Sequence, residues 1–441
     1  MKNIYMVGIK GVGMTSLAVY LKERGKNVWG SDVDETFPTD SVLRENDIDV
    51  ASGFAKEHIE DGIDLVITTG AHGGLENEEV LEAKRQNIPV YTHAYELGHV
   101  MDSFKHRIAV CGAHGKTTTS AMVAYVLHEL RLPASHLIGA SRFSGLYGGH
   151  YGGEEYLAVE ADEYATSIGI DNTPRFMSLN PNIIICTNID FDHPDVYPSI
   201  EEVKKAYLKF FQKLDRETGI LIYNSEDKHL QEVVSKLELK HLLPYSSNDE
   251  RINLLIPGKH NVSNAQSVVK LASILKLDKD KVLAALTSFH GVNRRFEKIS
   301  EDLYDDYAHH PAEIEALVGA AREKFPDKRI ILLFQPHTFS RTAALLSEFA
   351  TALSHADQSI VIEVFSSARE IDTSHGTSQE LVEEAHKQGQ KNVTYSKKDE
   401  LVANLMKIYK KGDIVITVGA GSIYESHSDI IRSLSEEGMG G

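Results

Sequence analysis

Cysteine is nearly absent from this 441-residue sequence, and tryptophan occurs only once. Each of the two cysteines, Cys111 and Cys186, ends a run of β-branched apolar residues. Two buried strand thiols are therefore a better interpretation than a disulfide or a metal pair. Such cysteine usage is typical of a reducing compartment, so we expect a cytoplasmic protein.

Long hydrophobic runs and an excess of positive charge are also missing. No stretch approaches the roughly 18 uninterrupted apolar residues of a membrane span, and Lys10 interrupts the apolar N-terminus. We therefore expect neither a signal peptide nor a membrane partner. The 46 Lys and Arg residues against 64 Asp and Glu give a net charge of −18, which disfavours nucleic acid as a partner. The hydrophobic content of 42% promises an ordinary globular core.

Short apolar runs alternate with amphipathic stretches along the chain, which is the pattern of parallel α/β sheets. The alternation lapses around Asp102 to Arg107, and a further α/β stretch begins near Arg294. At about 150 residues per domain the length suggests three domains. The sequence predicts an α/β fold of three consecutive domains, at residues 1–104, 105–293 and 294–441.

The strongest local signal is GAHGKTTT, which starts at Gly112 between an expected strand and a helix expected to begin near Thr118. Glycines let backbone N–H groups turn toward an anion, and the helix N-terminus adds its dipole. Lys116 can reach the outer phosphates, and the Thr117 hydroxyl can ligate Mg²⁺. The loop is short for a P-loop, because two residues rather than four separate its glycines. A purely structural turn is the weaker alternative.

A second glycine-rich loop, VGIKGVGM, follows the first expected strand, and Asp32 ends the next one. An acidic residue about 20 positions after such a loop suggests a dinucleotide site. The glycines, however, run G-x-x-G-x-G instead of G-x-G-x-x-G. This spacing favours a pyrophosphate of some kind, with a nicotinamide cofactor or a plain turn as alternatives.

Acidic and amide residues follow other expected strands. Glu160, in EADE, could hold a metal beside a phosphate loop. Asp192 and His193 end NIDFDH and could meet the same centre, although His193 could also simply cap or pack in a polar loop. Asn261 and Asn264, three residues apart, can share one face of a helix start, where capping and purine recognition are both possible.

The last third of the chain adds DDYAHHP, between an expected strand and an expected helix. Arg294, Arg295 and Arg341 supply guanidinium groups that suit phosphate or carboxylate. None of these segments is persuasive alone.

Together these segments resemble the Mur ligase family, the ATP-dependent enzymes that add amino acids to the UDP-linked muramyl precursor of peptidoglycan. The resemblance spans nearly the whole chain, and its motifs come in family order: GIKGVGM, GAHGKTTTS, EADE, NIDFDH, KHNVSNA, NRRFE, DDYAHHP, FQPHTFSR and VGAGSIY. It implies a Rossmann-like N-terminal domain for the UDP-substrate, a central P-loop ATP-binding domain, and a Rossmann-like C-terminal domain for the amino acid.

The resemblance also implies roles for individual residues. ATP would contact Gly112, His114, Gly115, Lys116, Thr117, Thr118, Asn264, Arg295 and Asp306, and the UDP-substrate would contact Gly8, Gly11, Val12, Gly13 and Asp32. The cofactor Mg²⁺ would be held by Thr117, Glu160 and His193, and Lys116, Glu160 and His193 would be catalytic. His309 and Arg341 would serve the amino-acid or phosphate end.

Within the family, DDYAHHP and FQPHTFSR favour the branch that joins L-alanine to UDP-N-acetylmuramate. EADEY and DFDHPDVY are more like the recycling branch, which attaches the tripeptide L-Ala-γ-D-Glu-meso-diaminopimelate, and Thr338 stands where the L-alanine branch usually has Arg. Later-step ligases carry a carbamylated lysine where this chain has Tyr207 or Leu208, which favours an early step. The segment from Asn224 to Pro257 is short for the family, so we expect strands to be missing there.

Two other function classes remain as alternatives: a nicotinamide oxidoreductase and a non-catalytic nucleotide-binding protein. Lys116, Thr117, Glu160 and His193 together argue against the second. Monomer and homodimer are both open.

Overall fold

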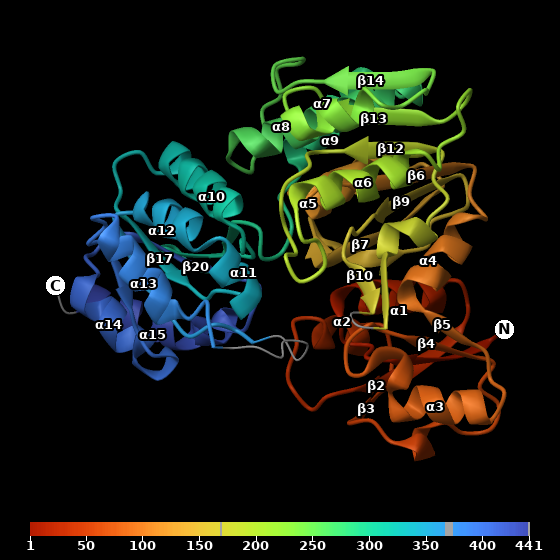
Figure 1. Ribbon diagram of the computed structural model, residues 1–441, viewed down its shortest axis with the longest axis horizontal. Helices are drawn as coiled ribbons and strands as arrows, with labels where there is room; N and C mark the ends of the chain where they lie inside the picture. Colours follow the sequence, from red (N-terminus) through yellow and green to blue (C-terminus); the bar gives the residue numbers. More distant parts are fainter. Residues whose placement is uncertain (168–169, 367–373, 440–441) are drawn as a thin grey trace. The chain divides into compact units, whose positions relative to one another are not determined.

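The computed structural model describes residues 1–167, 170–366 and 374–439. In this part of the chain the strands form α/β sheets that are mostly parallel, as predicted (Figure 1). The residues group into two compact units. The first holds Met1–Phe191, Val196–Leu255 and Val262–Val292, and the second holds Asp192–Asp195, Ile256–Asn261 and Asn293–Gly441. None of the described helices is both long enough and apolar enough to span a bilayer.

The N-terminal sheet of the first unit has the strand order β3-β2-β1-β4-β5, and its neighbours are all parallel. Its elements are β1 (Asn3–Val7), α1 (Val12–Glu23), β2 (Asn27–Asp32), α2 (Asp40–Glu45), β3 (Val50–Ser52), β4 (Leu65–Thr68), α3 (Glu78–Arg85), β5 (Val90–Thr92) and α4 (His93–Met101). The chain runs from β1 to β2 on one side and reaches β4 on the other. The strand order therefore reverses at β1, where open α/β sheets bind ligands beyond the strand ends.

The second sheet has the order β14-β13-β12-β6-β9-β7-β8, and only the β7–β8 hairpin among these described strands is antiparallel. Its strands are β6 (His106–Cys111), β7 (Ala134–Phe143), β8 (Leu146–His150), β9 (Tyr156–Glu160), β12 (Ile183–Cys186), β13 (Ile220–Asn224) and β14 (His241–Tyr245). Its helices are α5 (Lys116–Glu129), α6 (Ile200–Phe211), α7 (Lys228–Val234), α8 (Lys259–Ile274) and α9 (Lys279–Ser288). A short antiparallel pair, β10 (Ala165–Ser167) and β11 (Asp171–Pro174), follows β9.

The central strands of this sheet are continuously apolar because helices cover both of their faces. Every residue of β12 is buried. Cys111 and Cys186 face each other in register on β6 and β12, and both are free, buried thiols, as predicted.

Helix α1 joins the two sheets of the first unit, because it packs against β7 and β8 as well as against its own sheet (Figure 1). The Ser16 hydroxyl donates a hydrogen bond of 2.8 Å to the Ile138 carbonyl of β7. A side chain at Gly149 would overlap the backbone of Ser16, so glycine is required for this close packing. The division into domains 1–104, 105–293 and 294–441 remains our proposal.

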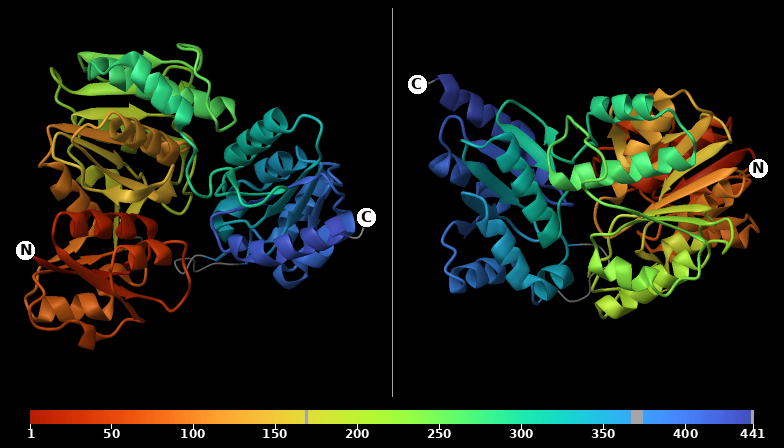
Figure 2. Two further views of the ribbon diagram at one scale, coloured as in Figure 1. Left: turned by 180° about the vertical axis from the view of Figure 1, so that it is seen from behind. Right: turned by 90° about the horizontal axis from the view of Figure 1, so that it is seen from above.

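The second unit contains a sheet of order β15-β16-β20-β17-β18-β19, in which β15 is antiparallel. Its strands are β15 (Glu297–Lys298), β16 (Leu303–Asp306), β17 (Ile330–Phe334), β18 (Gln358–Val361), β19 (Val393–Tyr395) and β20 (Ile414–Val418). Helices lie on both faces of it (Figure 2): α10 (Pro311–Lys324), α11 (Phe339–Ala344), α12 (Leu346–Ser354), α13 (Ser378–Lys387), α14 (Leu401–Ile408) and α15 (His427–Met439). β17 and β20 are wholly buried at its centre.

Candidate functional site

The loop between β6 and α5 has the backbone geometry of an anion cradle. Gly112 and Gly115 adopt φ of +136° and +79°, which disfavour residues with side chains. A methyl group at Gly112 would overlap the Thr187 hydroxyl, and one at Gly115 would lie 2.9 Å from Asn264 Oδ1. Helix α5 begins at Lys116, directly after Gly115, with no acidic residue in its first turn. Its N-terminal N–H groups therefore suit a phosphate.

Lys116 lies against carboxylates at the end of β9. Its Nζ is 2.8 Å from Glu163 Oε1 and 3.2 Å from the Ala113 carbonyl. Burial by itself lowers the pKa of Lys116, but the charges of Glu163, Asp162 and Glu160 outweigh it, so the net pKa is raised. The ammonium group therefore stays charged.

Glu160 is fixed by two neighbours at the same strand end. Thr117 Oγ1 donates to Glu160 Oε1 over 3.1 Å, and the Gly139 N–H donates to Glu160 Oε2 over 3.0 Å. Burial raises the pKa of Glu160 above its ordinary value, although Lys116 counteracts this. A hydroxyl beside a desolvated carboxylate is a hard-oxygen donor set, so the residues present fit Mg²⁺.

His114, inside the loop, is held by the segment after β12. The Asn188 side chain accepts from the His114 N–H over 2.9 Å and donates to the His114 carbonyl over 2.9 Å. The His114 ring lies 3.0 Å from Asp190 Oδ2. Asn188 and Asp190 belong to the quoted NIDFDH motif, yet nothing in the pattern marked them as supports of the loop.

Taken together, the first unit places Gly112, His114, Gly115, Lys116, Thr117, Thr118, Glu160 and Asn264 around one loop. Thr118 is buried as the third residue of α5. Glu163, which the sequence interpretation left without a role, is the direct partner of Lys116; its position in EADE was the available signal.

The N-terminal loop lies where the strand order reverses. Gly8 has φ of +76°, and a methyl group there would overlap the Thr69 side chain. Gly11 precedes α1, and Val12 and Gly13 form the start of that helix. A methyl group at Gly13 would lie 3.2 Å from His93 Nε2. The helix start is free of acidic residues and suits a pyrophosphate.

Asp32 supports this loop from the end of β2. Its Oδ2 accepts from the Lys10 N–H over 2.7 Å, and its Oδ1 accepts from the Val33 N–H over 2.8 Å. The Lys10 ammonium donates to the carbonyls of Val33 and Glu35, so it is engaged within its own loop region. The predicted contact of Asp32 with the UDP-substrate stays a prediction.

In the second unit, Arg341 forms a buried cluster with the segment Asp192–Asp195. Arg341 Nε donates to Asp192 Oδ1 over 2.8 Å, and Nη2 lies 3.4 Å from His193 Nδ1. Burial opposes ionisation of Asp192, but the charges of His193 and Arg341 hold its pKa well below the ordinary value. Burial lowers the pKa of His309 to about 4, so this imidazole is neutral near pH 7.

Arg295 and Asp306 lie near the start of the same unit. The Asp306 carboxylate accepts from the Phe296 and Ala308 N–H groups over 2.7 and 2.8 Å. Burial raises its pKa to about 6. Arg295 Nη1 is 3.6 Å from Glu313 Oε1. His193, Arg295, Asp306, His309 and Arg341 thus all belong to the second unit, and their joint use with the first remains a prediction.

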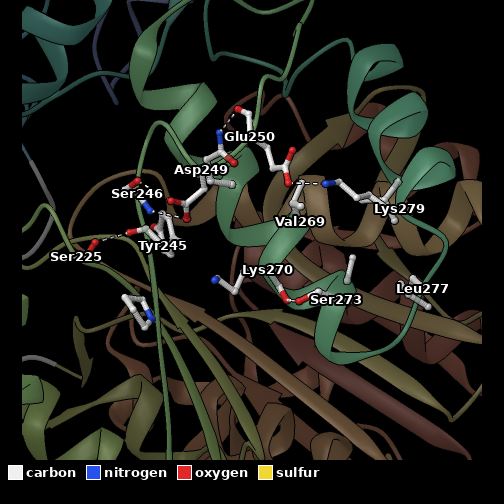
Figure 3. A pocket seen from close by; sticks show the side chains of 14 residues that line it. Ser225, Tyr245, Ser246, Asp249, Glu250, Val269, Lys270, Ser273, Leu277 and Lys279 are labelled. Atoms are coloured by element: carbon white, nitrogen blue, oxygen red, sulfur yellow. Dashed lines mark hydrogen bonds and ion pairs between the residues drawn. The ribbon is translucent and has the colours of Figure 1, made fainter.

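A cavity of about 570 Å³ lies elsewhere in the first unit, between the end of β14, α8 and α9 (Figure 3). Lys279 pairs with Glu250 across 2.5 Å at its wall, and Lys270 and Ser273 of α8 line it. None of the sequence-predicted site residues is among its lining residues, so it is distinct from the phosphate loop.

Comparison with known proteins identifies the family of the chain. Family models match three stretches: "Mur ligase family, catalytic domain" at residues 3–105, "Mur ligase middle domain" at 110–252 and "Mur ligase, glutamate ligase domain" at 294–421. The chain belongs to the Mur ligase family. The UDP-N-acetylmuramate–L-alanine ligase of Caldicellulosiruptor bescii is 37% identical to this Mur ligase over 98% of the chain and 99% of the relative. The enzyme of that name from Lactococcus lactis is 37% identical over 88% and 89%.

Solved structures agree on the fold of this Mur ligase. The UDP-N-acetylmuramate-alanine ligase MurC from Thermotoga maritima matches with a TM-score of 0.79 and 27% identity, covering 99% of this chain and all of that one. A murein peptide ligase from Psychrobacter arcticus matches with a TM-score of 0.73 at 22% identity, covering 98% and 99%. The second likeness concerns the fold alone.

Proposed function

We propose that this Mur ligase joins L-alanine to the muramate carboxylate of UDP-N-acetylmuramate, with ATP converted to ADP and phosphate. The observation that carries the proposal is the phosphate loop in which Lys116, Thr117 and Glu160 converge. The relatives named as L-alanine ligases, similar over nearly the full length, support the acceptor. The reaction is an early step of peptidoglycan precursor synthesis, which belongs in the cytoplasm.

ATP binds with its phosphates on the loop from Gly112 to Thr118, where the N–H groups of α5 face them. A muramate carboxylate oxygen attacks the γ-phosphorus, the bond to the β-γ bridging oxygen breaks, and ADP leaves an acyl phosphate. Lys116 offsets the negative charge that spreads over the transferring oxygens. Thr117 and Glu160, with His193 as a further ligand, would hold Mg²⁺, which supplies additional charge neutralisation.

The second step forms the amide. The neutral amine of L-alanine attacks the acyl carbonyl, a tetrahedral intermediate forms, and phosphate departs as the C–N bond is completed. The amine proton must be accepted, and His193 or a phosphate oxygen are the candidates. His309 and Arg341 serve the amino-acid or phosphate end, and Asn264, Arg295 and Asp306 complete the nucleotide contacts.

The UDP-substrate binds over the N-terminal loop. Val12 and Gly13 present backbone N–H groups at the start of α1. Gly8 and Gly11 shape the turn that precedes the helix, and Asp32 holds the loop through Lys10. A pyrophosphate at this helix start accounts for a Rossmann-like signal without a nicotinamide cofactor.

The proposal is tested by identifying the product. The enzyme is incubated with ATP, Mg²⁺, UDP-N-acetylmuramate and an equimolar mixture of L-alanine and L-Ala-γ-D-Glu-meso-diaminopimelate, and mass spectrometry reads the conjugate. We expect the L-alanine conjugate, and none with Lys116→Ala. The tripeptide conjugate alone would show that this is a recycling ligase, the alternative that Tyr164 and Ala165 after EADE favour. Absence of both conjugates would refute the proposal.

A further inference from the structure

Arg175 follows β11 and is anchored to the segment that carries EADE. Its Nη1 donates to Asp162 Oδ2 over 2.8 Å, and its guanidinium lies 5.5 Å from the centre of the Tyr164 ring. The Arg175 N–H also bonds the Tyr164 carbonyl over 2.9 Å. Both the backbone and the side chain of Arg175 are therefore fixed relative to Glu160 and Glu163.

The same segment packs against the N-terminal sheet's ligand edge. A methyl group at Gly70, just after β4, would overlap the Thr166 carbonyl, and one at Gly74 would lie 2.9 Å from Ser167 Oγ. These close approaches bring Thr166 and Ser167 beside the loop that follows β4, and that loop in turn meets the β1 loop, because the Thr69 side chain lies against Gly8. Arg175, bonded to the same segment at Asp162 and Tyr164, is therefore held on the side of the central sheet that faces the N-terminal loops.

His93, the first residue of α4, is a further neighbour of the proposed pyrophosphate loop. Its Nε2 lies at the start of α1, against Gly13. Burial lowers the pKa of His93 to about 4, and the positive charge of Arg175 contributes to that lowering. The guanidinium is thus close enough to act electrostatically at the proposed pyrophosphate loop, whereas His93 itself is uncharged near pH 7.

The guanidinium of Arg175 has hydrogen-bond donors that are not used by the described residues of the protein. A guanidinium has five N–H donors, and within the part of the chain that the structure describes Nη1 is the only side-chain atom of Arg175 that makes a hydrogen bond. The side chain is 28% exposed, so the remaining donors are reachable. Lys10, the lysine of the N-terminal loop itself, is taken up by the carbonyls of Val33 and Glu35. A fixed, partly exposed guanidinium is well suited to an anionic phosphate oxygen.

We propose that Arg175 binds a pyrophosphate oxygen of the UDP-linked substrate and thereby directs the sugar and its carboxylate toward Lys116. The inference rests on the proposed function, because it takes its ligand from there. It adds a specificity-determining residue from the central domain to a site otherwise built by the N-terminal domain.

The matched control is Arg142. It also pairs with a carboxylate, in its case Glu45 of the N-terminal domain, whose Oε1 lies 2.6 Å from Nη2, and its side chain is 29% exposed. It stacks on a tyrosine as well, 4.7 Å from the centre of the Tyr147 ring. Arg142 comes from the β7–β8 hairpin and not from the segment that follows Glu160. Arg142→Met therefore removes a similar ion pair without touching the proposed contact.

Binding to the full-length protein is measured by calorimetry for three ligands: UDP-N-acetylmuramate, UDP-N-acetylglucosamine, which has the pyrophosphate without the carboxylate, and ADP. We expect Arg175→Met to weaken the affinity for both UDP-sugars by about ten- to hundred-fold, as loss of a charged hydrogen bond does. The affinity for ADP should stay unchanged. Arg175→Lys should fall between the wild type and Arg175→Met. Arg142→Met should weaken the UDP-sugars less than threefold.

The inference is wrong if Arg175→Met binds the UDP-sugars as tightly as the wild type, or if Arg142→Met loses as much affinity for them. It is also wrong if Arg175→Met loses affinity for UDP-N-acetylmuramate alone, because Arg175 would then contact the carboxylate instead of the pyrophosphate. Unchanged ADP affinity certifies that Arg175→Met is folded. If the wild-type protein binds ADP but neither UDP-sugar, the proposed function itself fails. If the wild-type protein binds the UDP-sugars and Arg175→Met binds them equally well, only the inference about Arg175 fails.

Discussion

Replacing Lys116 by Met should destabilise the first unit in a pH-dependent way. Glu163 is only 2% exposed and would lose its partner while the carboxylates of Asp162 and Glu160 remain near. With Lys116 present, burial already raises its pKa from 4.5 to about 7; without the lysine its pKa rises further, so the folded variant stays protonated above pH 7. Each pH unit above that value costs about 1.4 kcal/mol. The expected loss relative to the wild-type protein is close to zero at pH 6 and about 2.7 kcal/mol at pH 9.

The sign follows from proton binding. The folded variant holds a proton that the unfolded chain releases above its ordinary pKa, so stability falls as pH rises. In the wild-type protein burial raises the pKa of Glu163 to about 7, so this fall ends near pH 7, whereas in the variant it continues above pH 7. Denaturant unfolding at pH 6 and 9, followed by far-ultraviolet circular dichroism, measures the difference.

Two variants make this prediction specific. Lys116→Met combined with Glu163→Gln should recover most of the lost stability, because the double variant has no carboxylate at position 163 to protonate. Lys204→Met is the matched control. Lys204 is also a buried lysine with two carboxylate partners, but Glu201 and Glu232 are 63% and 57% exposed, so water solvates them once the lysine is removed. A loss from Lys116→Met that is equal at both pH values, or no loss, would refute the reasoning.

Gly112→Ala should weaken ADP binding more than tenfold, because the added methyl group overlaps the Thr187 hydroxyl at a backbone φ of +136°; calorimetry that finds normal affinity would contradict the cradle. Glu160→Gln keeps the size of the side chain but removes its charge, so the Mg²⁺ concentration for half-maximal phosphate release should rise at least tenfold, while UDP-sugar affinity stays unchanged. Asp306, whose burial raises its pKa from 3.8 to about 6, should make the wild-type protein less stable as pH rises from about 4 to 6. Asp306→Asn should lack that fall, and unfolding at pH 4.5 and 6.5 that shows the same slope in both proteins would rule the explanation out.

Local patterns predicted the parallel sheets and the two glycine-rich loops between strand and helix, because those features depend on short sequence spans. Strand, glycine loop and helix are consecutive in GAHGKTTT, and the buried strands read as uninterrupted apolar runs. Helix α5 starts at Lys116, two residues before the expected position, because the left-handed Gly115 already turns the chain into the helix. The β7–β8 hairpin and β14 escaped notice, since β14 is an edge strand that carries Pro244.

The partners of the site residues could not be predicted, because they come from distant segments. Asn188 reaches His114, Glu163 reaches Lys116 and Gly139 reaches Glu160 only after β6, β7, β9 and β12 have assembled. Tyr207, expected at or beside the position of the later ligases' carbamylated lysine, is a core residue stacked edge-on against Phe176. The burial of Tyr207 fits an early-step ligase. The motif spacing alone did not decide whether Tyr207 or Leu208 occupies the position of the carbamylated lysine.

The acyl-phosphate route is the central claim, and isotope transfer tests it most directly. UDP-N-acetylmuramate is prepared with ¹⁸O in the muramate carboxylate, and the phosphate released with ATP, Mg²⁺ and L-alanine is analysed by mass spectrometry. The account predicts one carboxylate oxygen in each phosphate formed, because the oxygen that attacks the γ-phosphorus leaves with it. Phosphate without that label, released at the rate of amide formation, would contradict the account.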